Sequence, residues 1–516
     1  MKKEERFKKI IAHAKEYGFI FPSSEIYDGL AAVYDYGPNG AELKQQLKEY
    51  WWRSMTQGHE NIVGLDAAIF MHPKTWKASG HVDAFNDPLI DNKDSQKRYR
   101  ADVLLEDYAE KQNQKAEKEI AKARKRFGAD FDEAMYRDTN PRVKRYLDEA
   151  EDTLKRMAEA LETNDLERVK ALIEEKEIAC PVSGSKNWTE VRQFNLMYGT
   201  QMSSTAGAEG TLYLRPETAQ GIFVNFSQVQ KTQRMKVPFG IAQMGKAFRN
   251  EIVARQFIFR MREFEQLEMQ YFVRPGAEME AYRHWQEERM RWHRALGLPA
   301  HMYRWHDHEN LAHYANAASD IEFDFPFGFK ELEGIHSRTD FDLKAHQEHS
   351  GKRLQYYDPE LEESYVPYVV ETSIGLDRLF LAVLSASYAE ETLPDGSQRT
   401  VLHLPAPLAP TQVAILPLLK KDGLPEKARA LLAELRWDYR CQYDEKDAIG
   451  KRYRRHDAVG TPLCVTIDHQ TLDDETVTLR HRDSMEQERL PISALSSRIQ
   501  RSADLRQLLR AARAGA

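Results

Sequence analysis

The fold of this chain is decided by two neighbouring stretches, GKAFRNE at residues 245–251 and RMREFEQ at residues 260–266. Together they hold four arginines or lysines, three carboxylates and two aromatic residues. Apolar segments typical of β-strands lie on both sides, so we expect a hairpin. Burying such a cluster without polar ligands is costly. The two stretches therefore predict a site for a flat, anionic ligand.

A third stretch, ETSIGLDR at residues 371–378, places another arginine at the start of a strongly apolar helix. The sequence has neither a GxxxxGK[ST] loop nor a GxGxxG turn after a strand. Phosphate would therefore be held by side chains, and arginine forks hold it bidentately. We assign this role to Arg249 and Arg378, with ATP as the expected ligand. Taken alone, Arg378 fits a solvated surface arginine better, but the ETSIG residues beside it favour a site.

Length and composition limit the class of protein. A chain of 516 residues exceeds one hydrophobic core and predicts about two to four domains. No apolar stretch approaches the roughly 20 residues that span a bilayer, and the charged first residues do not form a secretory signal. Three scattered cysteines support neither a disulfide framework nor a cysteine-rich zinc site. We expect a cytoplasmic protein that does not contact membranes.

The order of apolar segments predicts the organisation of the chain. A helix is expected over residues 41–55, followed by a strand that ends at Pro73. Residues 106–177 are rich in Lys, Glu and Ala and predict a solvated helical module. Several strands with short connections then predict an antiparallel sheet. Residues 394–410 hold four prolines and a glycine turn, which predicts a domain boundary before a small α/β domain.

Net charge is −7, which argues against a protein that coats nucleic acid through its overall field. Local basic surfaces remain: KRYRRH at residues 451–456 and the arginines of the C-terminal tail. An RNA-binding surface and an ordinary solvated helix face are equally good interpretations of these residues.

At this point the chain resembles a known family, the bacterial-type, homodimeric glycyl-tRNA synthetases of class II. The helix from Ala41 and the strand that ends at Pro73 resemble the first of the three motifs of class II. In the family this motif forms the dimer interface, so the resemblance implies a dimer. The second is similar to residues 245–272 and the third to ETSIGLDRLFLAVL at residues 371–384. Further stretches agree: YDYGPNGAELK, KRYRADVLLE, FNLMYGT, LRPETAQGIFVNF and HSRTDFDL.

The resemblance implies an α+β catalytic domain built on an antiparallel sheet flanked by helices, over residues 1–105 and 178–395. It implies a helical insertion over residues 106–177 and a C-terminal α/β anticodon-binding domain over residues 396–516. The implied reaction joins glycine to tRNA(Gly) with ATP as a substrate, through glycyl-adenylate, and Mg²⁺ is expected to assist.

The resemblance also implies an ATP site. Arg249 would bridge the α-phosphate and the amino-acid carboxylate, Arg378 would hold the γ-phosphate, and both are expected to be catalytic. Phe264 would stack on adenine. The complete implied set is Arg249, Asn250, Glu251, Phe259, Arg260, Met261, Arg262, Glu263, Phe264, Glu331, Leu332, Gly375, Leu376, Asp377 and Arg378.

Glycine has no side chain to grasp, so only its ammonium and carboxylate can be bound, and larger amino acids must be excluded by size. Carboxylates suit the ammonium, and the resemblance implies a pocket with Glu217, Glu268 and Glu371. For a lone glutamate, a surface carboxylate would be the better interpretation. The complete implied set is Arg100, Glu217, Phe264, Glu265, Gln266, Leu267, Glu268, Glu371, Thr372, Ser373, Ile374 and Gly375. No editing site is required.

One departure concerns a Cys-Pro-x-Cys-Gly stretch that is frequent in the family. Here it reads Cys180-Pro181-Val182-Ser183-Gly184, so we expect no structural zinc and assign no metal ligands. Two other functions stay open. A non-catalytic RNA-binding relative would lack the ATP arginines, which are present. An enzyme for another small amino acid would need side-chain ligands that the three-glutamate pattern does not provide.

Overall fold

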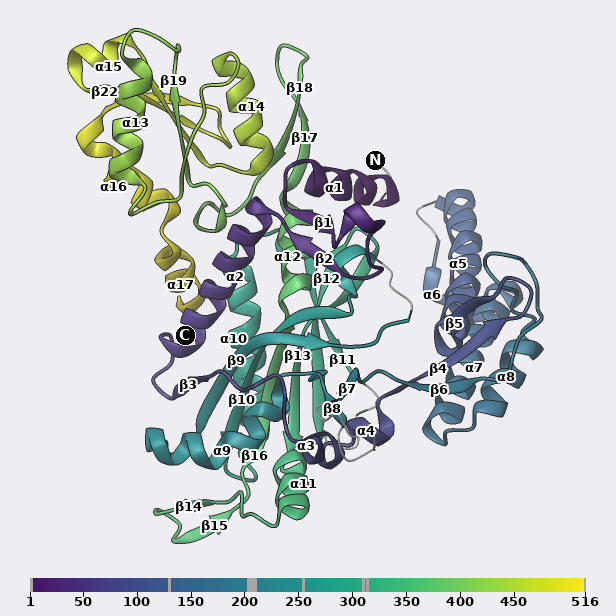
Figure 1. Cartoon of the computed structure of the whole chain (residues 1–516). Helices are drawn as coiled ribbons and strands as arrows, with labels where there is room; N and C mark the ends of the chain where they lie inside the picture. Colours follow the sequence, from purple (N-terminus) through teal and green to yellow (C-terminus); the bar gives the residue numbers. More distant parts are fainter. Residues whose placement is uncertain are drawn as a thin grey trace. The chain divides into compact units, whose positions relative to one another are not determined.

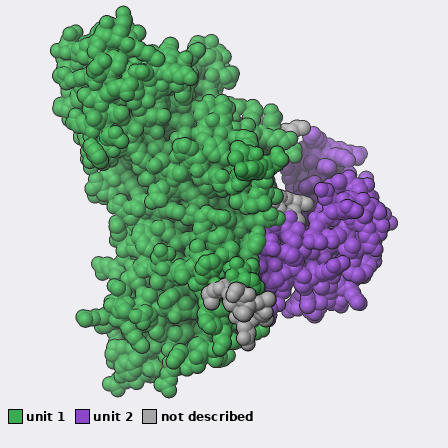
Figure 2. Space-filling model, viewed as in Figure 1, with its two compact units in different colours: residues 1–79, 198–249, 255–516 green, residues 80–197, 250–254 purple. Residues whose placement is uncertain are grey.

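The structure is a computed structural model that describes residues 3–128, 131–201, 211–252, 256–308, 311 and 315–514. Two compact units are present (Figures 1 and 2). The first contains residues 1–79, 198–249 and 255–516, and the second contains residues 80–197 and 250–254. None of the described helices is long and apolar enough to cross a lipid bilayer.

A seven-stranded sheet forms the centre of the first unit (Figure 1), in the order β11-β12-β13-β16-β10-β9-β3. The strands are β3 (Ile62–Leu65), β9 (Phe239–Phe248), β10 (Glu263–Val273), β11 (Tyr303–Asp307), β12 (Ala317–Phe325), β13 (Gly328–Thr339) and β16 (Tyr368–Gly375). All neighbours are antiparallel except β3, which pairs in parallel with β9. The predicted antiparallel sheet is therefore confirmed for six strands. The predicted strand up to Pro73 is much shorter, since Pro73 begins a helix, α3 (Pro73–Ala78).

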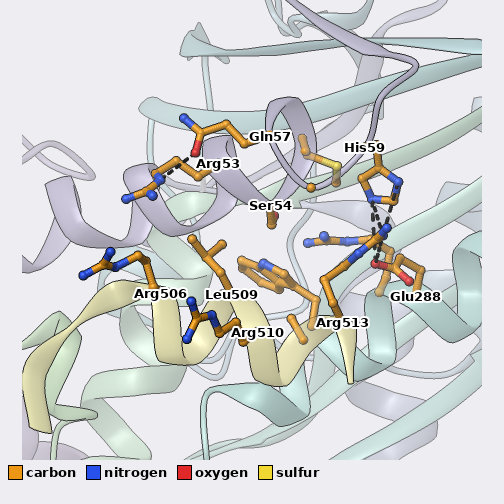
Figure 3. Close-up of a pocket in the computed structure, with 14 residues that line it drawn as sticks. Arg53, Ser54, Gln57, His59, Glu288, Arg506, Leu509, Arg510 and Arg513 are labelled. Carbon is orange, nitrogen blue, oxygen red and sulfur yellow. Dashed lines mark hydrogen bonds and ion pairs between the residues drawn. The ribbon is translucent and has the colours of Figure 1, made fainter. Parts of the chain in front are cut away.

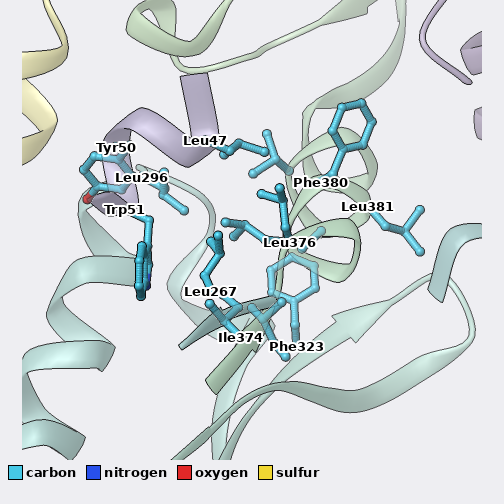
Figure 4. Close-up of a cluster of buried hydrophobic side chains, with 14 of the residues drawn as sticks. Leu47, Tyr50, Trp51, Leu267, Leu296, Phe323, Ile374, Leu376, Phe380 and Leu381 are labelled. Carbon is cyan, nitrogen blue, oxygen red and sulfur yellow. The ribbon is translucent and has the colours of Figure 1, made fainter. Parts of the chain in front are cut away.

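Helices cover both faces of this sheet because strand side chains alternate between faces. One face packs on α1 (Lys3–Glu16), α2 (Pro38–Thr56), α10 (Glu278–Ala295) and α12 (Leu376–Ser387), which supply the largest core. Leu47, Leu267, Ile374 and Phe380 meet there (Figure 4). The other face packs on α9 (Ala219–Gln233) and α11 (Phe341–Ser350) through a smaller core. The polar site described below lies on this second face.

Four hairpins complete this part of the chain. They are β1 (Ile20–Pro22) with β2 (Tyr34–Tyr36), β7 (Gly199–Gln201) with β8 (Thr211–Tyr213), β14 (Tyr356–Asp358) with β15 (Glu363–Tyr365), and β17 (Tyr388–Thr392) with β18 (Gln398–Leu402).

The C-terminal residues form a five-stranded mixed sheet in the order β20-β19-β21-β22-β23. Its strands are β19 (Val413–Pro417), β20 (Cys441–Tyr443), β21 (Leu463–Ile467), β22 (Thr476–His481) and β23 (Gln487–Pro491). The helices are α13 (Leu424–Leu435), α14 (Ile449–Val459), α15 (His469–Asp474), α16 (Ile492–Ala503) and α17 (Leu505–Arg513). This arrangement is the predicted small α/β fold.

The basic segment at residues 451–456 lies on α14, and only part of it faces solvent. Arg452 is 2% exposed and donates to the Pro417 carbonyl at 2.7 Å. Tyr453 bonds to Thr466 at 2.6 Å, and the Arg480 guanidinium lies over its ring at 4.8 Å. These side chains therefore hold α14 on its own sheet, which favours a structural role for Arg452 and Tyr453.

The second unit joins a helical bundle to a three-stranded sheet in the order β5-β4-β6. Its elements are α4 (His81–Ala84), β4 (Asn86–Asn92), β5 (Lys97–Arg100), α5 (Ala101–Phe127), α6 (Glu133–Thr139), α7 (Pro141–Glu162), α8 (Leu166–Glu175) and β6 (Arg192–Asn195). This unit is wider than the predicted insertion at residues 106–177, because β4 pairs both with β5 before the helices and with β6 after them.

Candidate active site

Two adjacent strands, β10 and β16, carry the polar residues of the site. Glu268 lies opposite Ser373, and Gln270 lies opposite Glu371. Residues directly opposite in a ladder share a face of the sheet, and every second residue along a strand returns to that face. Glu268 and Glu371 therefore project from the face on which α9 and α11 pack.

Glu268 is 3% exposed and accepts three hydrogen bonds. Thr218 donates to Oε2 at 2.6 Å, while Ser373 and Gln266 donate to Oε1 at 2.8 and 3.0 Å. Burial raises the pKa of Glu268 to about 8, and the like charges of Glu371 and Glu217 add to the rise. The carboxyl is thus held in a fixed orientation, with its charged form disfavoured.

Glu371 is 4% exposed, yet its environment is the opposite. Gln270 donates to it at 2.7 Å, His336 Nδ1 lies 3.0 Å from Oε1, and Arg338 donates at 3.3 Å. Burial alone would raise the pKa of Glu371, but the charge of Arg338 and the contacts with His336 lower it to about 2. This carboxylate stays ionised.

No role was predicted for Arg338, which lies in the HSRTDFDL stretch at residues 336–343. Arg338 Nε and Nη2 donate to Asp342 at 2.8 and 3.0 Å. Its neighbours Glu371 and Glu217 raise its pKa further, although burial opposes the rise. Glu217 accepts from Gln220 at 2.9 Å. The structure therefore brings the three predicted glutamates into one electrostatic group, with Arg338 as its fixed cation.

Arg249 directly follows β9 and is anchored at two points. Its Nε donates to the Pro216 carbonyl at 3.0 Å, and its guanidinium lies 5.2 Å from the centre of the Phe264 ring. Phe264 is half-buried and shares its face of β10 with Gln266 and Glu268. Arg249 and Phe264 thus lie at one end of the β9–β10 pair, and β10 also carries Glu268.

Arg378 lies in the first turn of α12. It pairs with Glu331 at 3.0 Å and lies 4.4 Å from the centre of the Phe259 ring, while the Phe259 carbonyl accepts from its Nε at 3.4 Å. Its side chain is 24% exposed. The interpretation as a solvated surface arginine therefore fails, because Arg378 has a fixed place beside Gly375, where β16 ends.

Other residues of the predicted sets lie on the opposite face. Glu265, Leu267, Thr372 and Ile374 alternate with the site residues, and Leu267 and Ile374 are fully buried in the largest core. Their side chains point away from Glu268 because two consecutive strand residues cannot share a face. The core also takes the side chains of Met261, Leu332 and Leu376.

Asp377 was predicted to contact ATP, but its side chain points into the protein. It is 2% exposed, accepts from Lys44 at 2.9 Å and from the Glu265 backbone at 2.8 Å, and also bonds to the Tyr36 hydroxyl. Lys44 reaches Glu265 at 3.0 Å. This buried network joins α2 to β10 and α12 directly beneath the site.

The remaining predicted residues have varied positions. Glu263 pairs with Lys246 at 2.5 Å. Arg260 is half-buried, and the Arg262 backbone donates to the Ala32 carbonyl at 2.9 Å. Arg100, Asn250 and Glu251 belong to the second compact unit. Within that unit, Arg100 pairs with Asp87 at 3.0 Å and with Asp102 at 2.5 Å.

Arg215 is a further residue that the sequence analysis missed. It is 2% exposed and donates to the Lys246 and Ala67 carbonyls at 2.7 and 2.8 Å. A Cβ at Gly245 would lie 2.2 Å from its Nη2. Gly245 is therefore required because Arg215 passes over its backbone. The sequence signal for this contact is Gly245 itself, the first residue of the GKAFRNE stretch.

The Cys180 loop lies in the second unit. The Cys180 thiol lies 3.1 Å from the Tyr99 hydroxyl and 3.3 Å from Ser95 Oγ. Ser183, where the family often has cysteine, bonds to Asn92 at 3.2 Å. Burial would raise the pKa of Cys180, but hydrogen bonds from Ser183, Ser95 and Tyr99 lower it to about 6. Within the described ranges, no three His, Cys, Asp or Glu side chains gather as a metal-binding group.

Comparison with protein families gives three matches. Residues 203–387 match the tRNA synthetase class II core domain (G, H, P, S and T). Residues 87–196 match the glycyl-tRNA synthetase insertion domain 1. Residues 412–502 match an anticodon-binding domain.

Curated relatives are similar over nearly the whole chain. Glycine–tRNA ligase of Chlorobaculum tepidum is 51% identical over 489 residues, which cover 94% of this chain and 97% of the relative. The enzymes of the same name from Macrococcus caseolyticus and Alkaliphilus oremlandii are 48% and 46% identical, each over 96% of this chain and 98% of the relative. The chain therefore belongs to the glycine–tRNA ligase family, with a class II tRNA synthetase core.

Proposed function

We propose that this chain is a glycine–tRNA ligase. It activates glycine with ATP to form glycyl-adenylate and pyrophosphate, then transfers glycine to the 3′-terminal adenosine of tRNA(Gly) and releases AMP. The observation that carries the proposal is the pair of buried glutamates, Glu268 and Glu371, on the strands that also position Arg249 and Arg378. Family membership and the class II core support it.

The first step needs alignment and positive charge rather than a general base, because the attacking glycine carboxylate is already ionised. It attacks the α-phosphorus of ATP and pyrophosphate leaves. Arg249 stabilises the charge shared by the α-phosphate and the carboxylate, and Arg378 holds the γ-phosphate. Phe264 stacks on adenine. Arg249 and Arg378 are suited to this work because each is held in place by a carbonyl and an aromatic ring.

Mg²⁺ would neutralise phosphate charge, and one or two carboxylates beside the phosphates would be enough to hold it. Glu331 fits this requirement: its side chain is 51% exposed and adjoins Arg378. The ion pair between Glu331 and Arg378 keeps this carboxylate beside the proposed γ-phosphate site.

Glycine is selected by charge and by size. The ammonium binds between Glu268 and Glu371, with Glu217 adding to the field, and Ser373 keeps Glu268 in place. Larger amino acids are rejected sterically, so no second, editing site is needed.

Membership of the family also supports assignments for tRNA binding, dimer formation and cellular location. We assign residues 396–516 to anticodon binding, and α2 with β3 to the interface of a homodimer. Since the reaction charges tRNA for protein synthesis, we place it in the cytoplasm.

Amino-acid-dependent ATP–pyrophosphate exchange tests the activity and its specificity together. Glycine should drive exchange, whereas alanine and serine should not. Exchange with alanine at a comparable kcat/KM would contradict the proposal that the glutamate pocket selects glycine. Absence of exchange with every amino acid, while tRNA still binds, would favour the non-catalytic RNA-binding relative.

A further inference from the structure

A cavity of about 280 Å³ lies between α17, α10 and the C-terminal end of α2 (Figure 3). It is on the face of the central sheet opposite Glu268, since α2 and α10 cover that face. Helix α17 follows residues 412–502, the part that matches an anticodon-binding domain. Leu505 and Ala512 of α17 are buried in the largest core. This packing fixes α17 in place as one wall of the cavity.

The lining of this cavity has a strong excess of positive charge. Its only carboxylate among the described lining residues is Glu288. The arginines that line it are Arg53, Arg289, Arg506, Arg510 and Arg513. Four of these arginines have a carboxylate within ion-pair distance: Arg513 and Glu288 at 3.3 Å, Arg506 and Asp504 at 2.6 Å, Arg53 and Glu49 at 3.8 Å, and Arg289 and Glu333 at 2.6 Å. Within the part of the chain that the structure describes, no carboxylate lies within ion-pair distance of Arg510.

Buried donors in the wall also lack acceptors. Arg289 is 1% exposed and donates from Nε to Glu333 at 2.6 Å, but its Nη2 has no acceptor among the described residues. Trp292 is also 1% exposed, and its Nε1 likewise has no hydrogen-bond acceptor among the described residues. An unsatisfied buried donor is costly. The Arg289 guanidinium also lies over the Trp292 ring at 4.3 Å, so this part of the wall combines positive charge with donor capacity that the protein itself leaves unused.

The arginines are divided between two ends of the cavity. Arg513 reaches His59 and Glu288 at one end, while Arg53, Arg506 and Arg510 lie toward the other (Figure 3). Arginine forks bind phosphate oxygens bidentately. We propose that this cavity is a second anion site, separate from the candidate active site, that binds phosphate or a small molecule bearing a phosphate group. A bound anion would hold α17 against α2 and α10.

The test is a thermal shift titration of the full-length protein with inorganic phosphate, pyrophosphate or AMP, at constant ionic strength. A ligand that binds only the folded protein raises Tm in a saturable way. We expect a saturable rise of several degrees in the wild type and in Arg378→Ala, whose change lies in the candidate active site. In Arg510→Ala, and in Arg510→Ala combined with Arg53→Ala, the midpoint concentration should increase at least tenfold.

Arg510 is exposed, so these variants should fold, and Arg510→Lys should bind with intermediate affinity. Arg501→Ala removes an equal charge from an exposed site on α16 outside the cavity and should behave as the wild type. Similar midpoints for all three ligands would identify the phosphate group as the ligand, and a midpoint much lower for AMP would identify a nucleotide. An unchanged midpoint in the double variant, loss of the shift in Arg378→Ala, or no saturable shift with any ligand would overturn the proposal. Glycine-dependent exchange should be unchanged in Arg510→Ala.

Discussion

Glu268 and Glu371 lie on the same face of two paired strands, with Glu371 two residues from Ser373, the register partner of Glu268, yet their pKa values move in opposite directions. Burial raises the pKa of Glu268 to about 8, and the charge of Glu371 adds to it. Arg338 and His336 overcome the same burial penalty at Glu371 and lower its pKa to about 2. Two neighbouring carboxyls in different protonation states are typical of a functional site.

This difference predicts how glycine binding depends on pH. Glycine's ammonium favours ionised Glu268, so binding lowers the pKa of this carboxyl from about 8 and releases a proton. Affinity should therefore increase as pH rises. We expect the KM for glycine to fall up to about tenfold per pH unit below 8 and to level off above it. Steady-state exchange between pH 6 and 8.5 measures this.

Glu268→Gln is the matched variant, because it keeps the size of the side chain and removes its titration. Its KM should be high and independent of pH over the same range. If the wild type shows an equally flat profile, Glu268 does not titrate on glycine binding and the assignment fails.

Arg378→Ala should lower kcat/KM for ATP–pyrophosphate exchange by about a thousandfold, because the γ-phosphate loses a positioned charge. Binding of tRNA, measured by filter retention, should be unchanged. Arg378→Lys should recover little of the activity, since lysine lacks the fork that reaches two oxygens.

Arg304→Ala is a suitable control for this prediction. Arg304 also lies over a phenylalanine ring, Phe329, at 4.2 Å and pairs with Glu322 at 2.5 Å, but it is an exposed residue of the edge strand. Exchange should continue at the wild-type rate in this variant. Normal exchange in Arg378→Ala would rule out the γ-phosphate role.

Asp377→Ala should destabilise the core. The change leaves Lys44, which is 7% exposed, with an incomplete set of partners and removes the acceptor of the Glu265 backbone donor. Breaking a buried charge network in this way costs about 3–5 kcal/mol. Calorimetry should show the Tm of the catalytic core lowered by about 6–15 °C.

Lys427→Met breaks an ion pair with Glu475, whose side chain is 64% exposed. It should change Tm by less than about 2 °C, because exposed pairs contribute little. A similarly small effect of Asp377→Ala would show that the buried network does not stabilise the core.

Gly245→Ala should disturb the site through Arg215. The new methyl group would lie 2.2 Å from Arg215 Nη2, and two carbonyls fix this arginine. Such overpacking costs about 1–3 kcal/mol, and displacement of β9, which Arg249 directly follows, should lower exchange activity at least tenfold. Tm and kcat/KM should fall together.

Gly450→Ala provides the comparison, since a Cβ at this position on α14 meets no atom within 4 Å. It should leave Tm and exchange unchanged or slightly raise Tm. Full activity in Gly245→Ala would mean that Arg215 can move aside without affecting β9.

Much of the fold could be predicted from local patterns. The helix from Ala41, the hairpin around residues 245–272 and the helix after Gly375 all form where the sequence places them. Two boundaries could not be predicted. The short strand β3 depends on a parallel pairing with β9, and the second unit depends on β4 joining β5 and β6 across about 90 intervening residues. Such pairings are set by contacts remote in sequence.

By itself, the sequence determined the family, the order of elements and the residues that supply charge to the site, because these depend on residue type and spacing along the chain. Only the tertiary structure decided which of those residues face one another. It directed Glu265 and Asp377 toward Lys44 and away from Glu268. It gave Glu268 and Glu371 opposite protonation states through partners more than thirty residues away, as with Arg338. A strand's alternation is local, whereas the burial and charges that set a pKa come from the packed fold.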